Sequence, residues 1–260
     1  MNRRILGAAA AAVVTVGTAT LGMSSTANAN HSWGGYHWAR TSNPFTLKLG
    51  DNVDSKWDST LGTTSSDWSK STVLDTTIVA GSTRPRTCKA TTGRVEVCNA
   101  RYGSNGWLGV ASISITGGTH ITKGTVKLND SYFDTPQYNT AAWRNLVSCQ
   151  EVGHTLGLDH QDEDFDNPNL GTCMDYTSNP STNQHPNQHD YDQLVAIYSH
   201  TDTTTTVGAA APSTGKGAGV ANTPKSWGKR IDGSRAQGVS TYVRHFKGGN
   251  DVVTYVVWAR

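Results

Sequence analysis

The sequence predicts an α/β protein with a mixed β-sheet and helices, followed by a small β-rich C-terminal tail. Two observations support this prediction. Between residues 43 and 200, runs rich in β-branched residues are interspersed with segments of helical periodicity. A composition break at residues 201–223 then separates this main domain from a last pair of strand-like runs.

Residues 1–29 have the composition of a secretory signal peptide. Arg3 and Arg4 precede an Ala- and Val-rich core, and Ala27-Asn28-Ala29 offers an A-x-A cleavage site. No other run approaches the roughly 18 apolar residues that a membrane-spanning helix requires. We therefore expect a secreted, extracellular protein without a membrane span, whose mature chain begins near Asn30.

The main domain, residues 30–200, is expected to contain strands and helices in a definite order. The strands are predicted from alternation and β-branched residues, and the helices from periodic apolar positions. We expect strands at 45–49, 74–80, 94–99, 108–115 and 125–128, and helices at 55–70, 140–156 and 190–198.

The helix at 140–156 carries polar residues on the side that should face the core. Asn139 is its expected N-cap and Gly157 its expected C′ residue. Residues four apart on a helix lie one above the other, so Gln150 and His154 can reach a common point. They continue an apolar stripe at helical spacing formed by Trp143, Leu146 and Val147.

His160 can reach the same point, although it lies six residues beyond His154. In a continued helix its side chain would point about 120° away. Gly157 can adopt a positive φ, end the helix and return the chain, so that His160 faces His154. The glycine is therefore part of the predicted metal site.

The last 60 residues divide into a linker and a tail. Residues 201–223 are rich in Thr, Ala and Gly and are predicted to be a linker, because they offer little apolar surface for a core. In the tail, residues 224–260, the runs 240–246 and 252–258 flank a Gly-Gly-Asn-Asp turn and predict a β-hairpin. A hairpin alone is marginal, so it should pack on the main domain, pair with a partner or stay loosely ordered.

The tail is basic and the main domain is acidic. The tail carries 7 Lys and Arg against 2 Asp and Glu, whereas residues 30–200 carry 12 against 17. The tail is therefore expected to contact an anionic surface or the catalytic domain, unless it is only a solvated basic segment.

The segment from Gln150 to His160 resembles the signature H-E-x-x-H-x-x-G-x-x-H of the metzincin zinc proteases. It matches at Glu151, His154, Gly157 and His160. Residues 173–176, Cys-Met-Asp-Tyr, resemble the Met-turn of that clan, and the strand pattern that ends at 124–130 is similar to that of the matrixin branch. The resemblance implies a metzincin-like twisted mixed sheet with an active-site helix and a Met-turn.

This resemblance implies a secreted zinc-dependent metalloendopeptidase. Zn²⁺ would be held by His154 and His160, and Met174 would form the hydrophobic floor of the site. Glu151 would act as general base on a zinc-activated water that hydrolyses a peptide bond in a protein or peptide substrate.

Gln150 departs from the signature, because the family has its first zinc-ligating histidine at this position. An amide oxygen is a neutral and weaker zinc ligand than imidazole. Gln150 could ligate zinc in a weakened site, hydrogen-bond a metal-bound water, or be a buried amide in a domain that has lost its metal. The last outcome leads to the alternative function, a non-catalytic metzincin-like binding protein.

Tyr176 is a further candidate catalytic residue. In astacins and serralysins a tyrosine at this distance from the Met-turn methionine reaches the zinc, which implies an extra ligand or an oxyanion stabiliser here. The alternative is a tyrosine packed on the wall of the cleft.

Four cysteines in an exported chain favour disulfides. Of the three possible pairings we favour Cys88 with Cys98 and Cys149 with Cys173. The resemblance implies that the helix lies over the Met-turn, which would bring the second pair together and join the two halves of the site. Cysteine as a zinc ligand is the competing role.

Other polar residues are weaker candidates for metal binding. The acidic run Asp162, Glu163, Asp164 and Asp166 could hold Ca²⁺ or form a solvated loop. His185 and His189 could form a second metal pair or be surface histidines, which is also the expectation for His120 and His245. We find no phosphate loop, G-x-S-x-G elbow or aromatic-basic nucleic-acid pattern, so no nucleic-acid partner is expected.

Overall fold

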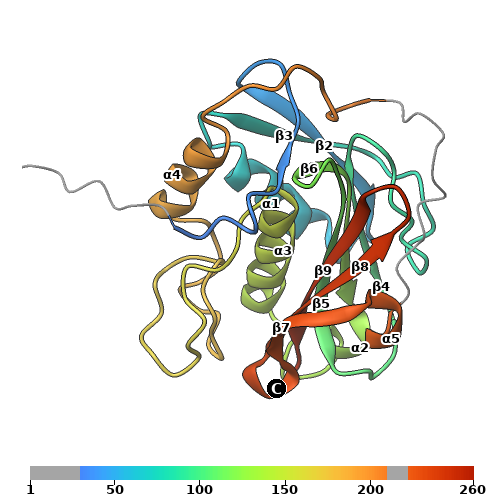
Figure 1. Cartoon of the computed structure of the whole chain (residues 1–260). Helices are drawn as coiled ribbons and strands as arrows, with labels where there is room; N and C mark the ends of the chain where they lie inside the picture. Colours follow the sequence, from blue (N-terminus) through green and yellow to red (C-terminus); the bar gives the residue numbers. More distant parts are fainter. Residues whose placement is uncertain (1–29, 210–221) are drawn as a thin grey trace, which may run out of the picture.

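The computed structural model describes residues 30–209 and 222–260 (Figure 1). The predicted signal peptide lies outside the described residues. Within them, one sheet contains the strands in the order β3-β2-β4-β6-β5-β9-β8-β7, and β1 pairs with β6. The strands are β1 (His37–Trp38), β2 (Phe45–Asn52), β3 (Leu74–Ala80), β4 (Val95–Ala100), β5 (Trp107–Thr116), β6 (His120–Asn129), β7 (Lys229–Ser234), β8 (Val239–Phe246) and β9 (Asn250–Trp258).

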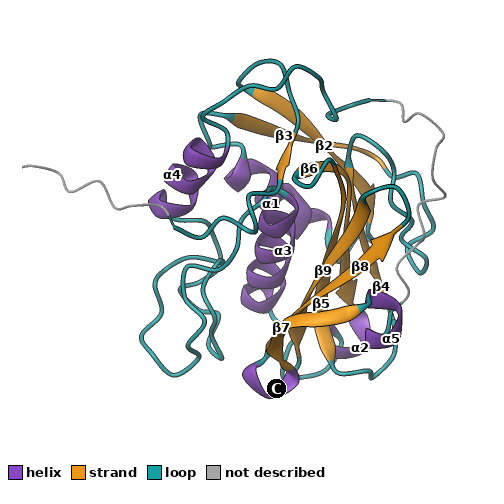
Figure 2. Cartoon of the chain, viewed as in Figure 1, coloured by secondary structure: helices purple, strands orange, loops and turns teal. Residues whose placement is uncertain are grey.

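The helices are short except for two that pack against each other. They are α1 (Asp58–Trp68), α2 (Asp130–Phe133), α3 (Ala141–Thr155), α4 (Gln188–Ile197) and α5 (Pro224–Trp227), with a 3-10 turn at Arg235–Gln237. Figure 2 shows α3 lying along one face of the sheet, where it contacts α1, β5 and β6.

The sheet is mixed because its two halves are connected differently. β2, β3, β4 and β6 are parallel neighbours, whereas β5 is antiparallel to β6 and joined to it by a short turn. The face towards α1 and α3 holds the main core, which includes Trp38, Trp68, Leu47 and Val126. The structure is therefore α/β with a mixed sheet, as the sequence predicts.

The predicted elements are found with changes at their ends. The predicted strand at 125–128 is extended in β6 to His120–Asn129, and β1, β7, α2 and α5 were not predicted. The expected N-cap of the long helix was wrong by one residue. Thr140 caps α3, and its hydroxyl accepts a hydrogen bond from the Trp143 amide, because Thr140 is the first residue with extended backbone before the helix.

The tail is part of the main sheet. The predicted hairpin is confirmed as β8 and β9, which pair along their length, and β9 also pairs antiparallel with β5. On the outer face of these strands, Trp227 of α5 packs with Trp107 of β5 and Trp258 of β9 in a second apolar cluster. The tail therefore adds three strands, β7 to β9, to the sheet.

The first nine residues of the predicted linker are bound to the main domain. Asp202 and Thr206 donate backbone hydrogen bonds to the carbonyls of Arg40 and Ala39 at 2.8 Å, and Gly208 donates to Gly93 at 2.9 Å. Polar composition did not prevent this docking, because backbone groups supply the contacts. Residues 210–221 lie outside the described residues.

Both expected disulfides are present, Cys88–Cys98 and Cys149–Cys173. Neither pair is available as a thiolate metal ligand in this state. Within the described ranges, no helix has the length and apolarity to cross a membrane.

Candidate metal and catalytic site

The turn after α3 brings the two motif histidines together. Gly157 has φ +99°, and its amide bonds the His154 carbonyl at 3.1 Å. A Cβ on Gly157 would lie 2.1 Å from the Tyr36 carbonyl oxygen, so only glycine fits this turn. The chain then returns, and the rings of His154 and His160 lie with centroids 4.6 Å apart.

Both histidines present a buried nitrogen without a protein partner. His154 Nδ1 donates to the Leu158 carbonyl at 2.9 Å, which leaves the lone pair on Nε2. The Nε2 atoms of His154 and His160 are buried and have no hydrogen bond. Burial lowers the pKa of His154 to about 3, with a further contribution from His160, and burial also lowers the pKa of His160. Both rings are therefore neutral, which is the form that binds metals.

Glu151, three residues before His154, lies in the interface between α3 and β5. Its side chain is fully buried, and its carboxylate oxygens have no hydrogen bond to any described residue. The Ala111 backbone is close but outside hydrogen-bonding geometry, and burial raises the pKa of Glu151 well above its ordinary value. A Cβ at Gly109 of β5 would lie 2.4 Å from Oε1, so this glycine makes room for the carboxylate.

Gln150 is buried one turn before His154 and is oriented by a backbone carbonyl. Its amide nitrogen donates to the Cys173 carbonyl at 2.9 Å. The neighbouring disulfide Cys149–Cys173 holds α3 and the Cys173 segment together. Because the two ends of an amide diverge, Oε1 of Gln150 points away from that carbonyl and is the atom free to bind a cation.

The Met174 segment lies beneath α3. Met174 is fully buried, and a Cβ at Gly153 would come within 2.6 Å of its sulfur, so the helix approaches the thioether closely. The Gln161 amide donates to the Met174 carbonyl at 2.7 Å, which ties the strand-like return after His160 to this segment. The ring centroids of Tyr176 and His160 lie 4.2 Å apart.

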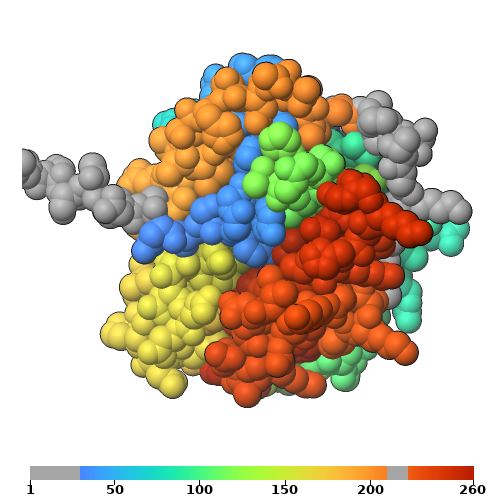
Figure 3. Space-filling model, viewed as in Figure 1, coloured from blue at the N-terminus to red at the C-terminus, as the bar shows by residue number. Residues whose placement is uncertain are grey.

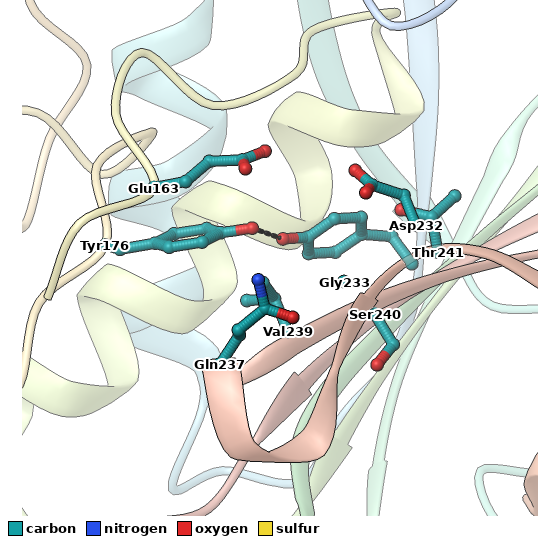
Figure 4. Close-up of a pocket in the computed structure, with 9 residues that line it drawn as sticks. Glu163, Tyr176, Asp232, Gly233, Gln237, Val239, Ser240 and Thr241 are labelled. Atoms are coloured by element: carbon teal, nitrogen blue, oxygen red, sulfur yellow. Dashed lines mark hydrogen bonds between the residues drawn. The ribbon is translucent and has the colours of Figure 1, made fainter.

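Tyr255 is a site residue that the sequence analysis did not identify. It lies on β9, opposite Ala111 of β5, and is only 2% exposed. Its ring centroid is 4.0 Å from that of His154, and its hydroxyl lies 3.1 Å from His160 Nδ1. The same hydroxyl is 2.5 Å from the Tyr176 hydroxyl (Figure 4). The alternation of the hairpin was visible in the sequence, but not the strand against which it would pair.

The two histidines are covered from both sides. Tyr255 closes the site on the β9 side, and Trp33 of the N-terminal segment lies with its ring centroid 5.7 Å from that of His154. His154 is fully buried and His160 is 6% exposed. The pocket in Figure 4 lies on the outer side of the Tyr176–Tyr255 pair, between Glu163 and Asp232. A ligand in this pocket would meet the tyrosines before the histidines.

Two groups of three His, Cys, Asp or Glu side chains place ligand atoms within 4.8 Å of one another in the part of the chain that the structure describes. One is Asp159, His160 and Glu163, beside the candidate site. The other, His37, His120 and Asp202, lies elsewhere. Glu151 and His154 belong to neither group.

The remaining candidates from the sequence have other partners. In the acidic run, Asp162 and Asp164 accept the amides of Asp164 and Asp166 at 2.6 and 2.9 Å. These contacts form turns within the loop. His185 bonds Asp67 at 2.6 Å and His189 stacks on His31, so the two rings do not form a pair. His245 bonds Asp251 at 2.9 Å within the β8–β9 hairpin.

No protein-family model and no curated protein matches the sequence. Among solved structures, the chain is similar to high choriolytic enzyme 1, a hatching-enzyme zinc protease from the medaka fish Oryzias latipes. The TM-score is 0.34 and the identity 10%, over 63% of this chain and 94% of that one. A similarity of this size does not establish a shared activity.

Proposed function

We propose that the protein is a zinc-dependent peptide hydrolase whose active site is covered by its own C-terminal strand. The observation that supports this proposal most directly is the pair of buried imidazole nitrogens, Nε2 of His154 and His160, that have no hydrogen-bond partner among the described residues. Buried polar atoms are nearly always satisfied, so two unpaired nitrogens on rings whose centroids lie 4.6 Å apart favour a shared partner. A divalent cation satisfies two lone pairs at once.

The donor set fits zinc with one weakened position. His154 and His160 would bind through Nε2, and Oε1 of Gln150 would be the third donor, since its Nε2 is held by Cys173. When bound, zinc would supply Lewis-acid activation of water and of the peptide carbonyl. Three protein donors leave one position open for that chemistry.

Glu151 would move the proton in this reaction. It is the carboxylate adjacent to Gln150 on α3, and no hydrogen bond or ion pair holds its oxygens in another role. A carboxylate in that position can accept a proton from water and return it to the leaving amine. The burial that leaves it unpaired is consistent with a catalytic rather than a structural use, because a structural carboxylate would be paired.

Access to this site requires movement of the tail. β9 occupies the edge of β5, and an extended peptide that reached the histidines would have to pair with that edge in its place. The Tyr255 side chain, on β9, fills the space above His154. We therefore infer that the described state is latent and that displacement of β9 opens the site.

The first experiment compares zinc content and cleavage of casein in the purified protein and four variants. Glu151→Gln should keep zinc but lose at least about 100-fold in cleavage rate, the usual size of a general-base effect. Asp192→Asn, an exposed carboxylate on α4, is the matched control and should change neither value. Tyr255→Ala is included because it uncovers the histidines.

Tyr255→Ala should raise the rates of zinc uptake and of cleavage, whereas Tyr255→Phe should not. The phenylalanine keeps the ring over His154 and loses only the hydroxyl bonds to His160 and Tyr176. A faster rate in both variants would assign the restraint to the hydroxyl rather than to the ring.

A second candidate function is a non-catalytic binding protein of the same fold. It is favoured by the amide at position 150 and by the complete covering of His154. This candidate predicts no stoichiometric zinc at His154 and His160 and no cleavage, even by Tyr255→Ala. That combination of results would exclude the hydrolase.

A further inference from the structure

We propose a structural zinc site, separate from the candidate active site, formed by His37, His120, His200 and Asp202. His37 lies on β1 and His120 begins β6, and the two residues are direct neighbours in the parallel pairing of these strands. His200 and Asp202 follow α4. The sequence analysis treated His120 as a surface histidine, because nothing local shows that three distant segments meet at it.

The side chains converge on one carboxylate oxygen. Oδ1 of Asp202 lies 3.1 Å from Nε2 of His120, 3.6 Å from Nε2 of His37 and 3.8 Å from Nε2 of His200. Nε2 of His200 is also 3.2 Å from Nε2 of His37. Three imidazoles thus direct the same ring nitrogen towards a single oxygen.

The hydrogen bonds of these ligand atoms within the described residues are to one another. Nε2 of His120 bonds Oδ1 of Asp202, and Nε2 of His200 bonds Nε2 of His37, so a cation would replace these contacts. Nδ1 of His37 lies 2.9 Å from the Gly35 carbonyl, which can only accept, so Nδ1 carries the proton and Nε2 has the lone pair. The Arg40 side chain and backbone donate to Oδ2 of Asp202 at 2.9 and 3.1 Å. Oδ1 therefore faces the imidazoles, and its charge partner Arg40 is on the far side of the carboxylate. Such outer contacts are typical of the second shell of a zinc site.

The spacing suits tetrahedral zinc. Metal–ligand bonds of about 2.0 Å place neighbouring ligand atoms roughly 3.3 Å apart. Four of the six separations in the group, 3.1, 3.2, 3.6 and 3.8 Å, lie close to that value. His37, His120 and Asp202 already hold ligand atoms within 4.8 Å of one another, whereas His200 lies outside that limit from His120 and would move towards it around the ion. Three imidazoles and one carboxylate complete the coordination and leave no open position, which is the character of a structural site.

The ion would hold three parts of the fold together. Figure 3 shows the N-terminal segment in blue beside the green turn between β5 and β6 and the orange chain that follows α4. His37 is 7% exposed and the Asp202 side chain 10%, whereas the side chains of His120 and His200 are 32% and 48% exposed. Zinc would therefore enter past His120 and His200 and fix the segment that leads to Trp33.

The test is a zinc titration of the exported protein and of the double variant His120→Ala/His200→Ala. The double variant should bind one zinc fewer per molecule than the wild type. Zinc should also raise the melting temperature of the wild type, and the double variant should lose this rise. The matched control is His185→Ala/His245→Ala, which removes two exposed histidines that are also paired with carboxylates. It should bind as much zinc as the wild type.

Cobalt substitution gives an independent readout. The wild type should show the intense visible absorption of tetrahedral Co²⁺, and the double variant should show less by the contribution of one ion. If the double variant fails to fold, the single variant His200→Ala is used instead. It should weaken the affinity of this site for zinc at least about tenfold. Equal zinc binding by the wild type and the His120/His200 variants, or equal loss in the control, would overturn the proposal. The difference of one ion is expected whether or not the candidate active site binds zinc.

Discussion

Gln150 lies one helical turn before His154, with its amide nitrogen bonded to the Cys173 carbonyl. That bond positions the amide oxygen as a neutral donor where a third imidazole would bind zinc more strongly. In the proposed hydrolase this residue would set the affinity of the site for metal, while Glu151 and the two histidines would set its chemistry.

Replacing Gln150 tests this role in both directions. Gln150→His should tighten zinc binding by roughly 100-fold, an effect larger than those of outer-shell contacts. Gln150→Leu should weaken it if the amide oxygen is a ligand. Both variants lose the hydrogen bond to the Cys173 carbonyl, so each controls for the loss of that bond in the other. Competition with a chelator measures the zinc affinities. Equal zinc affinity of the wild type and the leucine variant would remove Gln150 from the ligand set.

Part of the candidate site could be predicted from single residues and their spacing. Gln150 and His154 follow from the helical period and His160 from the glycine that ends the helix, whereas Glu151 follows from the resemblance to the zinc-protease signature. Tyr255 could not be found this way, because it comes from a strand 95 residues beyond His160. The pairing of β9 with β5 depends on tertiary contacts that no local pattern encodes. The His37 group depends on three separate segments for the same reason.

At the scale of elements, the turn between α3 and His160 is the most constrained connection. Gly157 combines a positive φ with a contact that no side chain can occupy, at 2.1 Å from the Tyr36 carbonyl. The N-terminal segment docks on this turn, since the Trp33 amide donates to the Gly157 carbonyl at 2.8 Å. Strain at Gly157 would therefore displace both His160 and Trp33, whose ring packs against His154.

Gly157→Ala should destabilise the protein by about 3 kcal/mol, because it adds a steric clash to the cost of the backbone conformation. Gly171→Ala is the control: its φ is +75°, but nothing lies within 4 Å of the added Cβ. This control should cost only about 1 kcal/mol. Urea unfolding measures both, and equal costs would show that the contact with Tyr36 does not constrain the turn.

The order of strands could be predicted less well than their existence. The β-branched runs predicted β2 to β6 and the hairpin β8–β9, because a pleated strand has a period of two. β1 has two residues and β7 alternates weakly, so neither has a local signature. Placement of the tail at the edge of β5 follows from burial of its apolar face, which includes Val253 and Tyr255.

At the scale of the whole molecule, one sheet joins the main domain to the tail, and its two faces bury two apolar clusters. Lys127 of β6 is 4% exposed near the second cluster, and its ammonium donates to Asn222 just before α5 at 2.8 Å. Burial lowers the pKa of Lys127 to about 8. This lysine links the stability of the molecule to pH.

The sign of this linkage follows from the two pKa values. Between about pH 8 and the unfolded value near 10.5, the unfolded chain binds more protons at Lys127 than the folded one, so stability rises with pH over that window. This contribution is lost progressively as pH falls from about 10.5 to 8, and it is absent below pH 8. The wild type should gain roughly 3 kcal/mol relative to Lys127→Met between pH 7 and pH 10.5. Urea unfolding at the two pH values checks this, and a pH-independent difference would contradict it.

In the proposed hydrolase, Nε2 of His154 and Nε2 of His160 share a zinc ion. Anomalous diffraction at the zinc absorption edge, from crystals of the protein equilibrated with zinc, tests this sharing most directly. We expect an anomalous peak about 2.0 Å from each of these nitrogens, beside Gln150. Crystals with zinc at His37, His120, His200 and Asp202 but no peak between His154 and His160 would contradict it.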